Sequence, residues 1–250
     1  ESVKTFLNSR NPVKQKILKN NLSNISKKLK KNISKNLSEE EALEIFKDIG
    51  IQIVNYKVSF NEKQAIEYSS QIGFPLAIKV LSNHILHKTE TGGVELNIKN
   101  LDELKISFQK LSDVFQKLKI NSSAKKFLIQ KMEKGISEII LGYRVDELVG
   151  PIVVIGSGGI LSEIYNDKSI RMAPVDITEA KKMIKEVKSL VTIAGYRGLP
   201  EADINIIANA IVNMSKFAFV KEIKEAEINP VIIKKEDEGI VAVDGIITLN

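Results

Sequence analysis

Cysteine and long hydrophobic runs are both absent from this chain of 250 residues. Without cysteine the chain can form no disulfide framework, no cysteine-ligated zinc site and no thiol nucleophile. The most apolar stretch, residues 150–161, is short and interrupted by glycines, so we do not expect it to span a bilayer. The lysine-rich first residues lack the apolar core of a signal peptide. We therefore expect a cytoplasmic protein that does not enter a membrane.

Positive charge is concentrated at the start of the chain. The formal net charge is +6, but residues 1–37 contain ten lysines and arginines and a single acid, which leaves 27 basic and 30 acidic residues in 38–250. Phe6 is the only aromatic residue in this basic segment. A nucleic-acid-binding surface usually spreads its basic residues over a folded face or interleaves them with aromatics. We therefore expect no nucleic-acid partner.

Apolar residues in the basic segment recur at helical spacing. This stripe consists of Leu18, Leu22, Ile25, Leu29, Ile33 and Leu37. Intervals of three and four predict a helix with one apolar face. Such a helix could dock on its own protein or a partner, or lie on a membrane surface. No aromatic residue anchors the apolar face, which favours docking on protein.

The remainder of the chain mixes helices and strands. Ser38 with Glu41 and Asp176 with Glu179 form capping-box patterns, and Asn61 is a candidate cap for a third helix. Helices are predicted over residues 39–48, 62–71, 102–118, 177–187 and 203–219. Strands are predicted over 51–55, 76–80, 94–98, 127–132, 138–146, 152–155, 162–165, 170–173, 226–234 and 240–244. Because the strands of the second half follow one another closely, this order predicts an α+β fold with an antiparallel sheet.

A lysine and two histidines lie close together in the first half. Lys79 interrupts the apolar strand 76–80, where it either faces solvent at a sheet edge or reaches an anion. His84 and His87 share the following loop, which ends in Gly92 and Gly93. Glycines allow backbone N–H groups to approach a phosphate closely, and an imidazole can accept a phosphoryl group. Polar surface residues and metal ligation by both histidines are the alternatives.

Two further constellations contain candidate binding residues. The run Gly156-Ser157-Gly158-Gly159 follows a strand and could cradle a phosphate or turn a hairpin; it matches neither a Walker A loop nor a Rossmann fingerprint. The segment 225–230 precedes the predicted closing hairpin, which would bring Asn229 close to Asp244. Amide and carboxylate oxygens suit Mg²⁺ bound to nucleotide phosphates. The alternative is an ordinary polar hairpin.

Taken in order, these residues resemble the ATP-grasp subunit of ADP-forming acetyl-CoA synthetases, a family related to the β subunit of succinyl-CoA synthetase. The resemblance runs from about Leu37 to Ile247. It rests on Leu37 to Ala42, Gly73-Phe74-Pro75 with Lys79, Ile85-Leu86-His87-Lys88 with Gly92-Gly93-Val94, Glu138 to Gly142, Gly150-Pro151, Gly158-Gly159-Ile160 with Glu163, Arg171 to Pro174, Gly195 to Gly198 with Pro200, Glu227 to Pro230, and Val243-Asp244.

The resemblance implies an ATP-grasp fold, in which two α+β subdomains clasp a nucleotide. It implies that Lys79 binds phosphate and that the strand carrying Gln130 and Met132 meets the adenine. Glu138 would contact the nucleotide near the ribose. It further implies that Asn229 and Asp244 hold Mg²⁺ and that His87 relays a phosphoryl group. Possible phosphate contacts are Gly92, Gly93, Gly158, Gly159, Arg171 and Arg197; for the two arginines, surface ion pairing is the alternative.

The implied protein is the nucleotide-binding β subunit of an acid–CoA ligase. It would convert acyl-CoA, ADP and phosphate reversibly into a carboxylic acid, ATP and CoA. A CoA-binding α subunit or domain, carrying the first phosphohistidine, would complete a hetero-oligomer. We expect a basic helical extension at 1–37, a first subdomain at 38–126 whose entry helix and strand could pack on the second, and a second subdomain at 127–250 with the nucleotide and metal site. The alternative function is a degenerate, nucleotide-sensing ATP-grasp module like that of some protein acetyltransferases.

Overall fold

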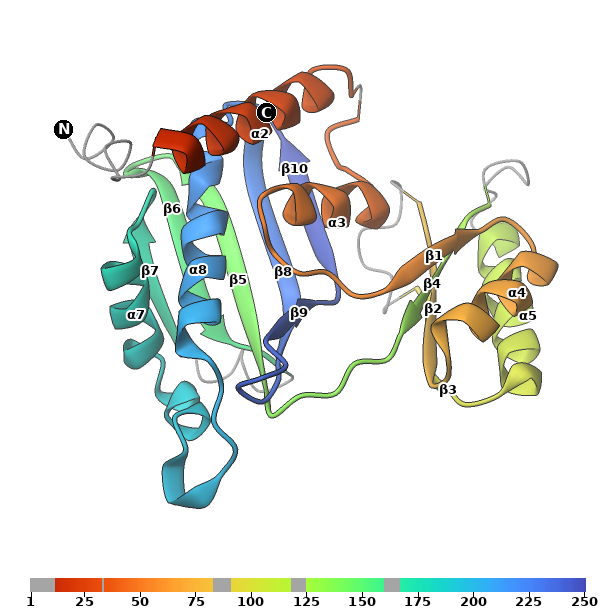
Figure 1. Cartoon of the computed structure of the whole chain (residues 1–250). Helices are drawn as coiled ribbons and strands as arrows, with labels where there is room; N and C mark the ends of the chain where they lie inside the picture. Colours follow the sequence, from red (N-terminus) through yellow and green to blue (C-terminus); the bar gives the residue numbers. More distant parts are fainter. Residues whose placement is uncertain (1–11, 33, 83–90, 118–124, 160–166) are drawn as a thin grey trace. The chain divides into compact units, whose positions relative to one another are not determined.

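The chain folds into two α+β units, each built on one antiparallel sheet (Figure 1). The computed structural model describes residues 12–32, 34–82, 91–117, 125–159 and 167–250, with the backbone alone for 12–20. The large unit comprises the described residues of 1–37, 41–53 and 134–250, and the small unit those of 38–40 and 54–133. The expected α+β class with antiparallel sheets is confirmed.

The large unit contains a six-stranded sheet. Its path runs β10-β8-β5-β6-β7, and β9 pairs with β8. The strands are β5 (Ser137–Asp146), β6 (Gly150–Ser157), β7 (Lys168–Met172), β8 (Ile223–Ile233), β9 (Ile240–Ala242) and β10 (Gly245–Leu249). The helices are α2 (Pro12–Leu29), α3 (Glu39–Asp48), α7 (Ile177–Glu186) and α8 (Ile204–Ser215), with 3₁₀ turns η2 (Lys188–Ile193), η3 (Tyr196–Gly198) and η4 (Lys216–Phe219).

One face of this sheet carries the core of the large unit. Along β5 the side chains of Ile139, Leu141 and Tyr143 alternate into a buried cluster that includes Ile211 and Met214 of α8. Because strand side chains alternate between faces, Glu138, Ile140 and Gly142 point to the opposite side. Figure 1 shows α8 crossing β5 and β6 on the core side, with α7 beside it. None of the described helices of this unit covers the other face of the sheet, which is called the helix-free face below.

The small unit has the same two-layer plan. Its sheet has the order β1-β4-β2-β3, formed by β1 (Tyr56–Ser59), β2 (Leu76–Val80), β3 (Val94–Ile98) and β4 (Phe127–Lys131). Helices α4 (Glu62–Ile72) and α5 (Leu101–Lys117) bury Leu104 and Leu111 against one side of it. As predicted, Asn61 caps α4, since its side chain accepts a hydrogen bond from the backbone N–H of Gln64 at 2.9 Å. Asp176 caps α7 in the same way through Glu179.

The basic helix α2 packs on its own protein, as the docking interpretation proposed. Ile25 and Leu29 are buried in the core of the large unit. Ser26 donates a hydrogen bond to Glu222 at 2.9 Å, and the ammonium of Lys28 lies 2.6 Å from Asp48. Within the described residues, no helix is both long and apolar enough to cross a bilayer.

Several predicted boundaries were wrong. Residues 51–55 form no strand: Ile53 makes only an isolated bridge to Ala242, and the strand begins at Tyr56. Residues 127–131 do not open the second subdomain, because β4 pairs with β1 and β2 in the small unit, whose last residue is Glu133. The described residues of the basic segment group with the large unit. The strand predicted at 162–165 lies outside the described residues.

Candidate functional site

Lys79 is a buried ammonium with a carboxylate partner. Strand β2 lies between β4 and β3, and all five of its residues are buried. The Nζ atom of Lys79 donates to Oε1 of Glu39 at 2.7 Å, and the side chains are only 4% and 1% exposed. A buried charge is stable only when it is paired or bonded, and Glu39 provides this. The solvated edge-strand interpretation of Lys79 is therefore wrong.

Lys79 shares one face of the small sheet with Gln130. Gln130 stands opposite Ala77, and Lys79 stands opposite Leu128. Directly paired residues project to the same side of a sheet, and so do residues two apart on one strand. Leu76, Ile78 and Val80 project to the other side, into the core with α4 and α5. Two buried polar side chains, Lys79 and Gln130, thus lie on the face of the small sheet opposite α4 and α5.

The glycine pair Gly92-Gly93 lies beside Lys79. The backbone N–H of Val80 donates to Gly93 O at 2.8 Å, and Lys79 stands opposite Val94. Gly92 has a φ of 69°, a left-handed conformation that glycine adopts without steric cost. His87 lies outside the described residues, so its predicted place next to this pair stays a prediction.

Met132 follows β4 instead of lying in it. Its backbone N–H donates to Pro75 O at 3.0 Å. The predicted adenine-binding segment is therefore held against the residue that precedes β2. This bond fixes the segment after β4 relative to the strand that carries Lys79.

In the large unit, Asn229 and Asp244 come together as the hairpin prediction required. The backbone N–H of Asn229 donates to Asp244 O at 3.1 Å, and Gly245 pairs with Ile228 at the start of β10. The Asn229 amide also donates to Glu227 at 3.5 Å. Burial raises the pKa of the Glu227 carboxyl; the hydrogen bond from Asn229 opposes this, and the charge of Glu225 adds to it.

Glu227 was not among the predicted ligands, although its sequence context contained a signal. It lies two residues before Asn229 on β8 and pairs with Gly142, which places it on the helix-free face. Residues two apart on a strand project to the same side, so the side chains of Glu227 and Asn229 are expected to lie close together. Because the segment 225–230 was already a candidate metal site, this spacing could have identified Glu227. Asn229 thus contacts Glu227 through its side-chain amide and Asp244 through its backbone N–H.

These three residues fit Mg²⁺ held together with a nucleotide. Among the described residues, no group of three or more acids or histidines is arranged to hold a metal. Mg²⁺ is usually bound through one or two carboxylates and the phosphates of its substrate, not by a protein cage. A carboxylate and an amide joined by a backbone hydrogen bond match that mode of binding.

Gly158 packs directly on the backbone of Glu138. Its N–H donates to Glu138 O at 2.8 Å, and a Cβ atom at position 158 would lie 2.8 Å from the carbonyl carbon of Glu138. Gly159 has a φ of 83°, and a Cβ there would lie 3.9 Å from Oε2 of Glu138. The glycine pair therefore meets the predicted ribose-side acid at one place on the large sheet.

The two arginines have different surroundings. Arg171 donates to Glu179 at 2.7 Å and also to Glu186, and these bonds raise the pKa of Arg171 and lower the pKa of both carboxyls. These contacts support the ion-pair interpretation of Arg171. Arg197 is exposed, has a left-handed φ of 53°, and stacks over the Tyr196 ring at 5.3 Å.

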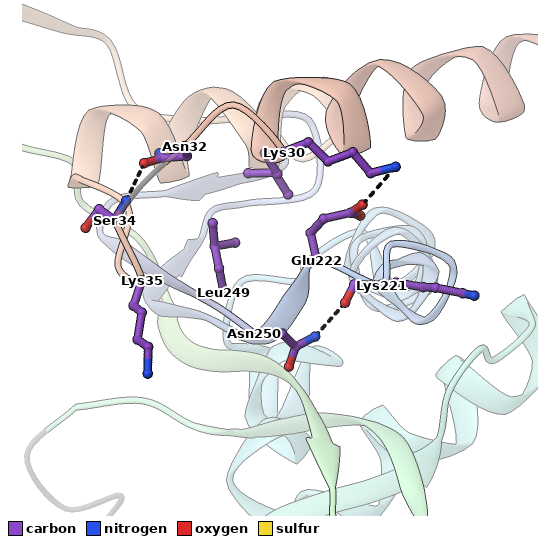
Figure 2. Close-up of a pocket in the computed structure, with 9 residues that line it drawn as sticks. Lys30, Asn32, Ser34, Lys35, Lys221, Glu222, Leu249 and Asn250 are labelled. Carbon is purple, nitrogen blue, oxygen red and sulfur yellow. Dashed lines mark hydrogen bonds and ion pairs between the residues drawn. The ribbon is translucent and has the colours of Figure 1, made fainter.

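A surface pocket of about 380 Å³ lies in another part of the large unit. It is lined by Leu29, Lys30, Asn32, Ser34, Lys35, Lys221, Glu222, Leu249 and Asn250. Figure 2 shows Lys30 reaching Glu222 across it and Asn250 bonded to the backbone of Lys221. None of the predicted site residues lines this pocket.

Comparisons with known proteins identify the family of the chain. The family model described as ATP-grasp domain matches residues 28–249. The β subunit of ADP-forming acetate–CoA ligase I from Pyrococcus furiosus is 39% identical over 207 residues, which cover 82% of this chain and 88% of that protein.

Solved structures of one archaeal enzyme are similar as well. Acetyl-coenzyme A synthetase 1 of Ca. Korarchaeum cryptofilum, in complex with coenzyme A, Ca-AMPCP and HgCl⁺, superposes with a TM-score of 0.81 at 31% identity and covers 91% of this chain and 99% of that one. A second structure of that enzyme contains coenzyme A and Mg-AMPPCP, with its phosphohistidine segment pointing towards the nucleotide binding site. It superposes with a TM-score of 0.76 at 31% identity, over 92% of this chain and all of that one.

Proposed function

The chain belongs to the ATP-grasp family, among the β subunits of ADP-forming acetate–CoA ligases, and we propose that it binds ADP or ATP with Mg²⁺ and transfers a phosphoryl group to and from the nucleotide. It is an acid–CoA ligase chain. The overall reaction converts acyl-CoA, ADP and phosphate reversibly into a carboxylic acid, ATP and CoA. The observation that carries the proposal is that Lys79, Glu138 and Glu227 each lie on the face of their sheet that is opposite the apolar core.

Each group of residues has a part in this proposal. Lys79 binds the phosphates, and the glycine backbones at 92–93 and 158–159 approach them closely. Gln130, Met132 and Glu138 contact the base and ribose. Asn229 and Asp244 hold Mg²⁺, which when bound neutralises charge on the phosphates. Phosphoryl transfer depends mostly on positioning and charge stabilisation, and these groups supply both.

The transfer step conserves atoms and charge without a redox partner. A terminal oxygen of the β-phosphate of ADP attacks the phosphorus of a phosphohistidine. The N–P bond breaks as the new P–O bond of ATP forms, and the imidazole leaves with its electron pair and takes up a proton. Lys79 is the residue of this chain that would stabilise the charge on the transferred group.

Two parts of the proposal involve groups beyond the described residues. The first phosphohistidine belongs to a CoA-binding α subunit or domain, as the β-subunit name of the Pyrococcus relative suggests. His87 would relay the phosphoryl group between that histidine and ADP, dividing a long transfer into two shorter ones. With the α partner present, His87→Ala should abolish acyl-CoA-dependent ATP formation but preserve Mg·ADP binding. Full ATP formation would remove the relay role.

The degenerate-sensor alternative is less well supported. A sensor needs no α subunit and no metal-dependent transfer. The relative that matches over most of its length is a ligase subunit. Retention of Lys79, Asn229 and Asp244 in suitable environments also supports a working site.

Nucleotide binding by the full chain tests the proposal. Isothermal titration with ADP, with and without Mg²⁺, should show metal-dependent binding in the wild type. Lys79→Met and Asp244→Asn should each weaken it at least about tenfold, since charged hydrogen bonds contribute about 1.5–3 kcal/mol. Lys57→Met on β1 and Asp237→Asn in the β8–β9 turn are exposed controls and should bind like the wild type. Equal binding by Lys79→Met and Lys57→Met would refute the role of Lys79.

A further inference from the structure

A buried ion pair joins the first residue of α3 to β2. The pair consists of Glu39 and Lys79, which are separated by 40 residues in the sequence, and both residues group with the small unit. Their side chains are among the few charged ones that the protein buries almost completely. Glu39 was not predicted as a site residue, because nothing local to it in the sequence points to Lys79.

Stability alone does not account for this pair. The other four residues of β2 are Leu76, Ala77, Ile78 and Val80, all apolar and buried. Replacing a buried ion pair by well-packed apolar residues is often neutral or stabilising, because desolvating two charges costs more than their attraction returns. A buried lysine on the face opposite the apolar core is thus expected where its charge serves a ligand.

The location of Glu39 suits it to keep that charge in place. Glu39 is the first residue of α3, and its buried carboxylate is therefore held by the helix at a fixed place beside β2. It contacts Nζ of Lys79 at 2.7 Å, and this pairing of opposite charges compensates for the burial of the ammonium. It also fixes the direction of the Lys79 side chain, which has several rotatable bonds.

We propose that Glu39 is a positioning residue for Lys79: its carboxylate holds the buried ammonium in a fixed place on the face of the small sheet opposite α4 and α5, where the ammonium binds the nucleotide phosphates. This inference rests on the proposed function, in which Lys79 contacts phosphate. Glu39 itself touches no reacting atom. Its effect on the nucleotide therefore passes entirely through Lys79.

A double-mutant cycle on the full chain tests this dependence. Calorimetric titration with Mg·ADP would compare the wild type with Glu39→Gln, Lys79→Met and the double variant. Glu39→Gln should weaken Mg·ADP binding about tenfold or more, as expected for loss of a charged hydrogen bond. Adding Glu39→Gln to Lys79→Met should change affinity less than about twofold, because the residue through which Glu39 acts is already absent.

Two further variants separate positioning from folding. Glu41→Gln alters an exposed carboxylate in the same first turn of α3 and should bind Mg·ADP like the wild type. Glu39→Asp keeps the charge with a shorter reach and should recover part of the affinity lost in Glu39→Gln. If Glu39→Gln does not fold, by circular dichroism, Glu39→Asp replaces it in the cycle: weaker binding than the wild type, with no effect in the Lys79→Met background, is then the supporting result.

The outcomes distinguish this inference from the proposed function. Unchanged or tighter Mg·ADP binding in Glu39→Gln would overturn the positioning role. The role would also be overturned if Glu39→Gln lowered Mg·ADP affinity equally in the wild-type and Lys79→Met backgrounds. Failure of the wild type to bind Mg·ADP, or normal binding by Lys79→Met, would instead refute the proposed function.

Discussion

Replacing Gly158 by alanine is expected to destabilise the large unit and weaken nucleotide binding together. The new methyl group would lie 2.8–2.9 Å from the carbonyl carbon, the carbonyl oxygen and the following nitrogen along the backbone at Glu138 and Ile139. These atoms cannot rotate away as a side chain would, because β5 is hydrogen-bonded to β6 on one side and to β8 on the other. Either the end of β6 must move away from β5, or the backbone of Glu138 must shift.

The magnitude follows from this overpacking. Steric insertion into a well-packed site costs about 1–3 kcal/mol, and each kcal/mol lowers the melting temperature of a chain this size by roughly 2–4 °C. Gly142→Ala is the matched control, since its Cβ would meet only Ala226 O and Val154 Cβ, both at 3.9 Å. The unfolding free energy of Gly142→Ala should stay within about 0.5 kcal/mol of the wild-type value, because the new methyl group makes only ordinary van der Waals contacts.

Urea unfolding and thermal melting followed by far-UV circular dichroism measure the first effect, and titration with Mg·ADP measures the second. Gly158→Ala should unfold earlier than Gly142→Ala and bind ADP more weakly, because Glu138 moves with the backbone. Equal stability of the two variants would refute the packing argument. If Gly158→Ala is destabilised but binds ADP with unchanged affinity, the proposed nucleotide-binding role of Glu138 and the glycine pair 158–159 is refuted.

Three other predictions concern stability. Ile25→Ala, at a fully buried position of α2, should lower the unfolding free energy by about 2–5 kcal/mol, whereas the exposed Ser23→Ala should not; equal stability by urea unfolding would mean that α2 is not part of the core. Because Arg171 lowers the pKa of Glu179 and Glu186, the contribution of these ion pairs to stability is present above the ordinary carboxyl pKa, near 4.3, and is lost as the pH falls through the lowered values. Arg171→Ala should therefore flatten the acid limb of a stability–pH profile without changing ADP affinity. A change in ADP affinity would instead support phosphate binding by Arg171. Arg197→Gly should raise the unfolding free energy by about 0.5–1 kcal/mol by relieving a left-handed φ, and a lower melting temperature would show that the Tyr196 stacking outweighs the strain.

Local signals in the sequence predicted the local structure well. Asn61 and Asp176 cap their helices because an N-cap depends only on a side chain and a backbone N–H three residues later. The closing hairpin was also predicted, since β8 and β9 pair across a turn in which Lys234 N donates to Gly239 O. Residues 245–249 were missed as a strand although they pair with β8 as β10.

Features that depend on distant residues were less predictable. Ile53 makes only a bridge to Ala242, a neighbour almost 190 residues away, so its β-branched side chain indicated a strand that does not form. β4 belongs to the small unit because of its partners β1 and β2, which no pattern within 127–131 reveals.

The candidate site shows the same division. The residue types and their order predicted Lys79, Asn229 and Asp244, and the adjacency of the last two followed from the hairpin. The partner of Lys79 could not be predicted in this way, because Glu39 belongs to a helix and lies 40 residues earlier in the sequence. The burial that raises the pKa of Glu227 depends likewise on packing of the whole sheet.

A crystal structure of the full chain with Mg·ADP would test the central claim most directly. We expect Lys79 Nζ to lie within hydrogen-bond distance of a phosphate oxygen of ADP, and Asn229 and Asp244 to hold the Mg²⁺. Density for ADP bound away from either group, or bound with the metal on other ligands, would contradict it.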